Sequence, residues 1–286
     1  MKQELVRINS TDNIEMVGIL YEPEIIGNKI VVHVHGLCGN FYENRFLDIL
    51  AKTYTDKGIS LLTFNNRGNN FISELLKGNE FKVIGGCYEK FNDCILDIDG
   101  AINFVKEKGY SDIILEGHSY GCNKISYYYN KKKDKSISKI VLLAPCDIPQ
   151  ECVKWLSKEE LEKAKKESTR LVNEGKENEL IDFSVNANGK IAAGSYYYEF
   201  LRNGENAFIR YSEGINGRSK VLNDIDIPVL VAFGDEDECV LTQDMEIVKG
   251  YLNNNIKECN IQIIKGADHS YTDKCKELGQ IIEQNI

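Results

Sequence analysis

The sequence contains no long apolar segment and few prolines, histidines or tryptophans. Its 286 residues include 4 Pro, 4 His and 1 Trp. No stretch approaches the ~18 consecutive apolar residues that a transmembrane helix requires. Residues 1–7 carry an acidic side chain and lack the apolar core of a signal peptide. We therefore expect a protein with no membrane span and no export signal.

The cysteines are not arranged as a disulfide framework or a zinc site. Their number, 9, is odd, and they are scattered along the chain without a CxxC pair. Reduced thiols in the cytoplasm fit this pattern better than disulfides. We expect a cytoplasmic protein without a metal site.

A basic face is also missing. The formal net charge is −9, which argues against a nucleic-acid partner, because phosphate binding requires clustered positive charge. The one dense basic run, residues 131–135, is typical of a solvated helix end. The sequence does not indicate an oligomeric state.

Apolar segments alternate with helical patterns along most of the chain. With 42% hydrophobic residues, the chain can form one large α/β domain with an insertion, or two small domains. A hairpin is expected over residues 5–22 with its turn at 10–13, helices over 45–56 and 89–108, and an irregular segment over 69–87. Buried strands are expected at residues 29–36, 59–64, 113–116, 139–145, 227–234 and 260–266. This order predicts a mostly parallel central sheet with helices on both faces.

Residues 147–225 are too long for an ordinary connection between two strands. They contain Ser157-Lys158-Glu159-Glu160, a capping box that opens a helix. Asn188-Gly189 is typical of a hairpin turn. After this turn comes a segment rich in aromatic residues: Tyr196, Tyr197, Tyr198, Phe200, Phe208 and Tyr211. We interpret residues 147–225 as a cap inserted into a single domain spanning 1–286, overhanging the carboxyl edge of the sheet.

The segment around Ser119 is typical of a nucleophile elbow. Gly117-His118-Ser119-Tyr120-Gly121 follows a β-branched run and precedes an amphipathic one. In such an elbow a strained strand-to-helix turn exposes the serine Oγ. A Cβ at either glycine would crowd the bend. We therefore expect Ser119 to be a nucleophile.

A serine nucleophile needs a base. The base can be identified among the four histidines by excluding the other three. His118 shares the turn with Ser119, while His33 and His35 belong to an earlier strand. His269 alone follows the last strand, where this architecture places its base. We expect His269 to be the general base.

The third member of the triad orients the imidazole. The loop 234–240 offers both Asp235 and Asp237, and the residues alone leave the choice open. Asp268 is adjacent to the base, so its side chain diverges from that of His269.

Two backbone N–H groups should form an oxyanion hole. We expect one from Tyr120, directly after the nucleophile, and one from Leu37, in the glycine loop that begins at Gly36. His35 is expected to brace that loop. His33 and His35 lack a third neighbouring ligand, so we expect them to bind no metal.

Together these segments resemble the α/β-hydrolase superfamily over nearly the whole chain. The resemblance is carried by His35-Gly36, Arg67-Gly68, the motif at 117–121, Gly234-x-x-Asp237 and Asp268-His269. It implies hydrolysis of an ester, thioester or amide through an acyl-enzyme, with no cofactor, and it favours Asp237 as the acid.

Residues 89–94 and 117–124 also resemble, less specifically, a branch that includes siderophore esterases. Asn65-Asn66 stands where relatives often have an acidic residue, and Cys122 replaces a common glycine.

We predict a serine carboxylesterase acting on a small-molecule ester. An amidase, peptidase or thioesterase with the same triad is the alternative within enzymes. A hydrolase fold that binds a ligand without turnover is the alternative of another class.

Overall fold

The protein is described from a computed structural model. The structure describes residues 1–148, 157–182, 191–196, 208–240 and 244–286. Within these ranges no helix combines the length and the apolar character needed to cross a bilayer.

The main sheet has the strand order β1-β2-β4-β3-β7-β8-β11-β12. Its strands are β1 (Lys2–Asn9), β2 (Glu15–Glu22), β3 (Lys29–Val34), β4 (Ser60–Phe64), β7 (Asp112–His118), β8 (Ile137–Leu143), β11 (Val229–Gly234) and β12 (Cys259–Ile264). β2 pairs antiparallel with β1 and β4, and each pair from β4 to β12 is parallel. The parallel strands therefore end at one common edge.

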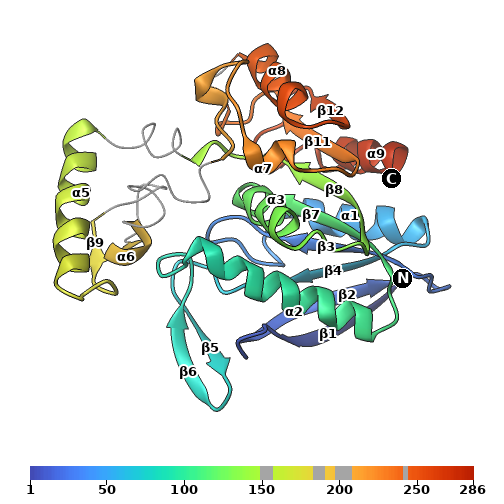
Figure 1. Cartoon of the computed structure of the whole chain (residues 1–286). Coiled ribbons are helices and arrows are strands. Elements are labelled where there is room, and N and C mark those ends of the chain that lie inside the picture. Colours follow the sequence, from blue (N-terminus) through green and yellow to red (C-terminus); the bar gives the residue numbers. More distant parts are fainter. Residues whose placement is uncertain (149–156, 183–190, 197–207, 241–243) are drawn as a thin grey trace.

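Helices cover both faces of this sheet (Figure 1). The helices around it are α1 (Phe46–Asp56), α2 (Cys94–Glu107), α3 (Tyr120–Lys132), α8 (Met245–Asn255) and α9 (Cys275–Asn285), with a 3-10 turn η1 (Phe91–Asp93) before α2. Val31 packs with α1 and α9 on one face, whereas its neighbour Val32 packs with α2 and α3 on the other. Strands buried on both faces explain the unbroken apolar runs in the sequence. The predicted parallel sheet with two helical layers is confirmed.

The segment predicted to be irregular contains a hairpin. β5 (Ser73–Lys77) pairs antiparallel with β6 (Glu80–Ile84), and Gly78 adopts φ 62° in the turn between them. The hairpin projects from the sheet (Figure 1) and leaves Phe81 72% exposed. The prediction of irregular structure over residues 69–87 was wrong, because strands this short and exposed lack a repeating apolar face.

The described part of the chain between β8 and β11 contains one 16-residue helix and several short elements. These are α5 (Lys158–Asn173), β9 (Leu180–Ile181), β10 (Ile191–Ala192), α6 (Ala193–Tyr196), a 3-10 turn η3 (Tyr211–Glu213) and α7 (Lys220–Asn223). α5, β9 and α6 form a group to one side of the sheet (Figure 1).

The capping box predicted at the start of α5 is confirmed. Ser157 Oγ accepts a hydrogen bond from Glu160 N at 3.2 Å, and Ser157 N donates to Glu160 Oε2 at 2.7 Å. The predicted turn at Asn188-Gly189 and the aromatic residues Tyr197, Tyr198 and Phe200 lie outside the described residues.

Candidate active site

A cavity of about 550 Å³ opens at the edge where the parallel strands end. Loops that follow β3, β7, β8, β11 and β12 contribute to its lining, with Leu37, Ser119, Cys146, Glu238 and His269 among the lining residues. Ligands of open α/β sheets bind outside the carboxyl ends of the strands. This cavity therefore occupies the position expected for a substrate site.

Ser119 lies on a sharp turn between β7 and α3. Its backbone adopts φ 57° and ψ −128°, a conformation that L-residues rarely take. A Cβ at Gly117 would lie 2.6 Å from the carbonyl carbon of Gly121, and a Cβ at Gly121 would lie 2.1 Å from Val34 O. Only glycine fits at these two positions, which agrees with the steric reasoning from the sequence.

Asp237 and His269 are directly hydrogen-bonded. Asp237 Oδ1 lies 2.9 Å from His269 Nδ1 and also accepts the Cys239 N–H at 2.8 Å. The Asp237 side chain is buried, with only 1% of the residue exposed. Asp235 instead accepts a hydrogen bond from Gly266 N. Of the two aspartates left open by the sequence, Asp237 is therefore the one in contact with the histidine.

The environment of His269 increases the proton affinity of its ring. Burial lowers the pKa of His269, but the hydrogen bond and the charge of Asp237, together with the Cys239 thiol, raise that pKa well above its ordinary value. A carboxylate beside the ring stabilises the imidazolium, as required of a base that holds a proton during a reaction.

His118 supports the loop that carries His269. His118 Nε2 donates to the carbonyl oxygen of His269 at 2.8 Å, and the two rings lie 5.0 Å apart. Burial lowers the pKa of His118 well below its ordinary value, so its ring is neutral. The His269 N–H in turn donates to Glu238 Oε2 at 3.1 Å. The His118 ring is thus hydrogen-bonded to the loop of His269, whereas Ser119 Oγ is hydrogen-bonded to Cys146 Sγ.

Leu37 and Tyr120 line the cavity together with Ser119. Gly36 lets the loop approach closely, because a Cβ on Gly36 would lie 2.8 Å from Ser119 Cβ. Tyr120 is the first residue of α3. The first N–H groups of a helix have no partner within the helix, and they lie at the end that carries the positive partial charge of the helix dipole.

His35 joins two loops beside the site. Its Nε2 accepts the Asn66 N–H at 3.1 Å, so Nδ1 carries the proton and donates to Gly36 O at 2.9 Å. Burial and the nearby Lys124 lower the pKa of His35 to about 3. The neutral ring connects the loop after β3 to the loop after β4.

His33 faces a different set of partners. Its Nδ1 lies 2.7 Å from Glu116 Oε1, and Tyr54 OH donates to Glu116 Oε2 at 2.5 Å. All three residues are buried in the sheet–helix interface. His33 and His35 therefore serve separate hydrogen-bond networks.

Two cysteines that the sequence analysis did not single out also line the cavity. Cys146 Sγ lies 3.3 Å from Ser119 Oγ, and Cys239 stands beside the Asp237–His269 pair. The Cys146 thiol, followed by burial, raises the pKa of Cys239 above its ordinary value. One signal in the sequence could have identified them: both residues follow predicted buried strands, and Cys239 lies in the loop where the acid was sought.

Solved structures with the same fold cover almost the whole chain. A ferulic acid complex of Est1E from Butyrivibrio proteoclasticus is 17% identical, with a TM-score of 0.68 over 98% of this chain and 97% of that one. The esterase domain of a Rhodothermus marinus protein is 13% identical, with a TM-score of 0.63 over 99% and 97%. The Pyrococcus furiosus esterase Pf2001 is 15% identical, with a TM-score of 0.61 over 99% and 91%.

At these identities the likeness establishes the fold, which is that of the α/β hydrolases. No curated protein sequence matches the chain significantly. A family model described as serine aminopeptidase, S33, matches residues 27–273. Because this match spans most of the chain, the protein belongs to the serine aminopeptidase S33 family of α/β hydrolases.

Proposed function

We propose that the protein is a serine esterase that cleaves a small-molecule carboxylic ester through an acyl-enzyme intermediate. One observation carries the proposal. The strained elbow residue Ser119 and the hydrogen-bonded Asp237–His269 pair line or border one cavity at the carboxyl edge of the sheet. A nucleophile, a base and a group that orients the base are the requirements of this chemistry.

In this mechanism Ser119 Oγ attacks the ester carbonyl carbon while His269 Nε2 takes the hydroxyl proton. Asp237 holds Nδ1–H and stabilises the imidazolium. The N–H groups of Leu37 and Tyr120 stabilise the negative charge on the carbonyl oxygen. Collapse of the tetrahedral intermediate expels the alcohol, which receives the proton from His269. Water then attacks the acyl-enzyme with His269 as base again.

Ser119 Oγ shares a hydrogen bond with Cys146 Sγ at 3.3 Å in this structure. Catalytic hydrogen bonds are often long or misaligned before the substrate binds. We expect Oγ to leave the sulfur and approach His269 Nε2 in the substrate complex.

Residues 147–225 are proposed to act as a cap that selects the acyl or leaving group, within one domain spanning 1–286. Ile148 supports this role, because it stands at the start of the segment and lines the cavity next to the elbow. A cytoplasmic location is part of the same proposal, as inferred from the scattered cysteines.

A second candidate is hydrolysis of a peptide or an amino-acyl amide. The description of the family as serine aminopeptidases supports it, as do the carboxylates of Glu43 and Glu238 in the cavity wall. An anionic group there could pair with the α-ammonium of a peptide.

The proposal is tested with matched panels of esters, thioesters and amino-acyl amides. Ser126→Ala serves as the control for Ser119→Ala, because Ser126 is a buried serine of the same helix region. We expect ester turnover by the wild type and the control. Loss of Ser119 should reduce kcat by about 10⁶-fold. Turnover of amides alone would favour the peptidase, and binding without turnover of any class would favour a silent module.

A further inference from the structure

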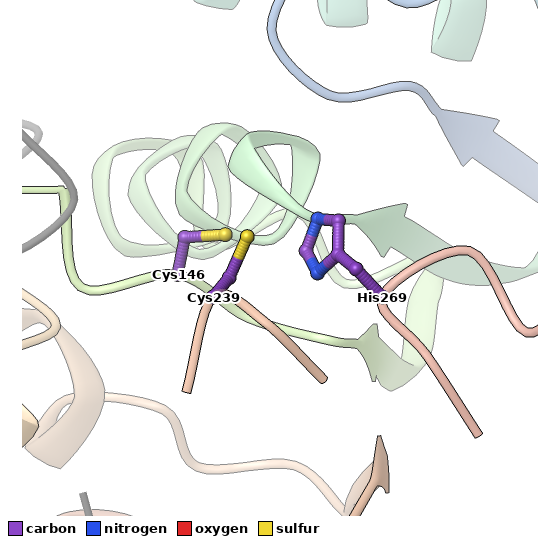
Figure 2. A group of neighbouring side chains, drawn as sticks. All are labelled: Cys146, Cys239 and His269. Atoms are coloured by element: carbon purple, nitrogen blue, oxygen red, sulfur yellow. The ribbon is translucent and has the colours of Figure 1, made fainter. Parts of the chain in front are cut away.

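A cluster of two thiols and an imidazole lies beside Ser119. The ligand atoms of Cys146, Cys239 and His269 all lie within 4.8 Å of one another. Figure 2 shows the two sulfur atoms close together, with the ring of His269 beside them on a separate loop. The three residues follow β8, β11 and β12, so the parallel sheet itself brings them to one place.

Two thiolates and one imidazole are a ligand set for tetrahedral Zn²⁺. With Zn–S near 2.3 Å and Zn–N near 2.0 Å, ligand atoms around the ion are about 3.5–3.8 Å apart. The spacing in the cluster is close enough for side-chain rotation to reach this geometry. Cysteine sulfur favours soft cations over Mg²⁺ or Ca²⁺.

Asp237 already holds two members of the cluster in place. It accepts the Cys239 N–H at 2.8 Å and lies 2.9 Å from His269 Nδ1. This leaves His269 Nε2 as the ring nitrogen available to a metal. A carboxylate bonded to the far nitrogen of a metal-binding histidine is a common arrangement around zinc, because it fixes the ring and strengthens the ligand.

We propose that Cys146, Cys239 and His269 form an inhibitory site for a thiophilic divalent cation such as Zn²⁺. The two thiols release their protons to solvent as the ion binds, and His269 Nε2 donates its lone pair to the metal. Ser119 Oγ, 3.3 Å from Cys146 Sγ, or a water molecule completes the coordination. Binding of the cation needs only this cluster, whereas the inhibition rests on the proposed function of His269 as base. From the sequence we expect no metal site, because the cysteines are scattered along the chain. This proposal replaces that expectation.

The inhibition follows because the metal and the proton of Ser119 would use the same atom, His269 Nε2. A metal on His269 Nε2 removes the lone pair that would take the proton of Ser119. The cation also occupies the cavity beside the elbow, where the substrate carbonyl would bind. Zinc-bound protein should therefore neither activate Ser119 nor admit the ester.

The first test measures binding without reference to activity. Co²⁺ is titrated into reduced, metal-free protein, and the absorption bands of tetrahedral Co²⁺ with thiolate ligands are recorded. We expect one equivalent of Co²⁺ to produce these bands and one equivalent of Zn²⁺ to remove them. Cys146→Ser and Cys239→Ser should each lose the bands. Cys275→Ser should retain them, because Cys275 lies on α9, outside the cluster.

One further variant separates a metal site from a general effect of cysteine loss. Asp237→Asn keeps all three ligands and should weaken Zn²⁺ binding by about 10–100-fold, as expected when the group that orients a ligand is changed. Circular dichroism establishes that each variant is folded. If thiolate bands do not form, or have the same intensity in the wild type and both cluster variants, the proposal is wrong.

The second test measures inhibition. Each ester-hydrolysis rate with one equivalent of Zn²⁺ is divided by the rate of the same variant in chelator. This ratio should be about 0.1 or lower for the wild type and Cys275→Ser, and should be near one for Cys239→Ser. An unchanged or increased wild-type rate would overturn the inhibitory role. If the protein hydrolyses no ester, the Co²⁺ titration still decides whether the site exists.

Discussion

Asp237 and His269 are separated in the chain by α8 and β12, yet Asp237 Oδ1 lies 2.9 Å from His269 Nδ1. Gly234 ends β11 directly before this loop, and a Cβ there would lie 2.0 Å from Ala267 O. The close approach of these two loops lets a buried carboxylate reach the imidazole. The pair is the basis of the proposed proton transfer from Ser119.

The role of this pair predicts different results for the two aspartates of the loop. Asp237→Asn should keep the fold but favour the wrong imidazole tautomer, lowering kcat by about 10⁴-fold, the scale of this change in a serine protease. Asp235→Asn should cost at most about 1 kcal/mol of stability, because it affects one local hydrogen bond to Gly266 N. Both variants are compared by kcat and by Tm on the same ester. Loss of activity in Asp235→Asn with activity retained in Asp237→Asn would identify Asp235 as the acid.

Ile148 should influence which esters are cleaved. Its side chain lines the cavity and is 6% exposed, so Ile148→Ala enlarges the space beside Ser119. We expect the ratio of kcat/KM for a bulky ester to that for a short one to rise about tenfold. Ile225→Ala is the control, because Ile225 is buried but is not among the described residues that line the cavity. Equal kcat/KM ratios in the two variants would show that Ile148 does not influence which esters are cleaved.

The buried neutral ring of His35 predicts a dependence of stability on pH. The pKa of His35 is lowered from 6.5 to about 3 in the folded protein, so below about pH 6 the unfolded chain binds a proton that the folded protein does not. Stability should therefore be lost as the pH falls from 6 towards 3. One such proton contributes a slope of about 1.4 kcal/mol per pH unit.

His35→Gln measures this contribution, because glutamine keeps a donor and an acceptor but does not titrate. The free energy of unfolding is obtained from urea denaturation between pH 4 and 6 for both proteins. The slope against pH should be smaller in the variant by about 1.4 kcal/mol per pH unit. His118 retains its own contribution in both proteins, since its pKa is also lowered. Parallel stability curves would show that His35 is not neutral in the fold.

The sheet and its helices were predictable because their signals are local. Strands buried on both faces, such as β3 and β4, appear as continuous apolar runs, and the glycines around Ser119 mark a turn that other residues cannot occupy. The hairpin β5–β6 was missed because Phe81 and Val83 are exposed, so no buried face repeats along it.

The contacts within the site depend on the fold rather than on local patterns. The position of Asp235 and Asp237 in one loop indicated an acid but not which carboxylate turns towards His269. That choice is set by the approach of the loops after β11 and β12. Cys146 and Cys239 meet because β8 and β11 are neighbours in the sheet, an order that spacing along the chain does not reveal.

The nucleophilic role of Ser119 is tested most directly by intact-mass measurement after treatment with a fluorophosphonate. We predict one adduct per chain, located on Ser119 by peptide mapping and absent in Ser119→Ala. Ser270→Ala should still be labelled, although Ser270 lines the same cavity. An adduct on Ser270 or on any other residue, or no adduct at all, would contradict the account.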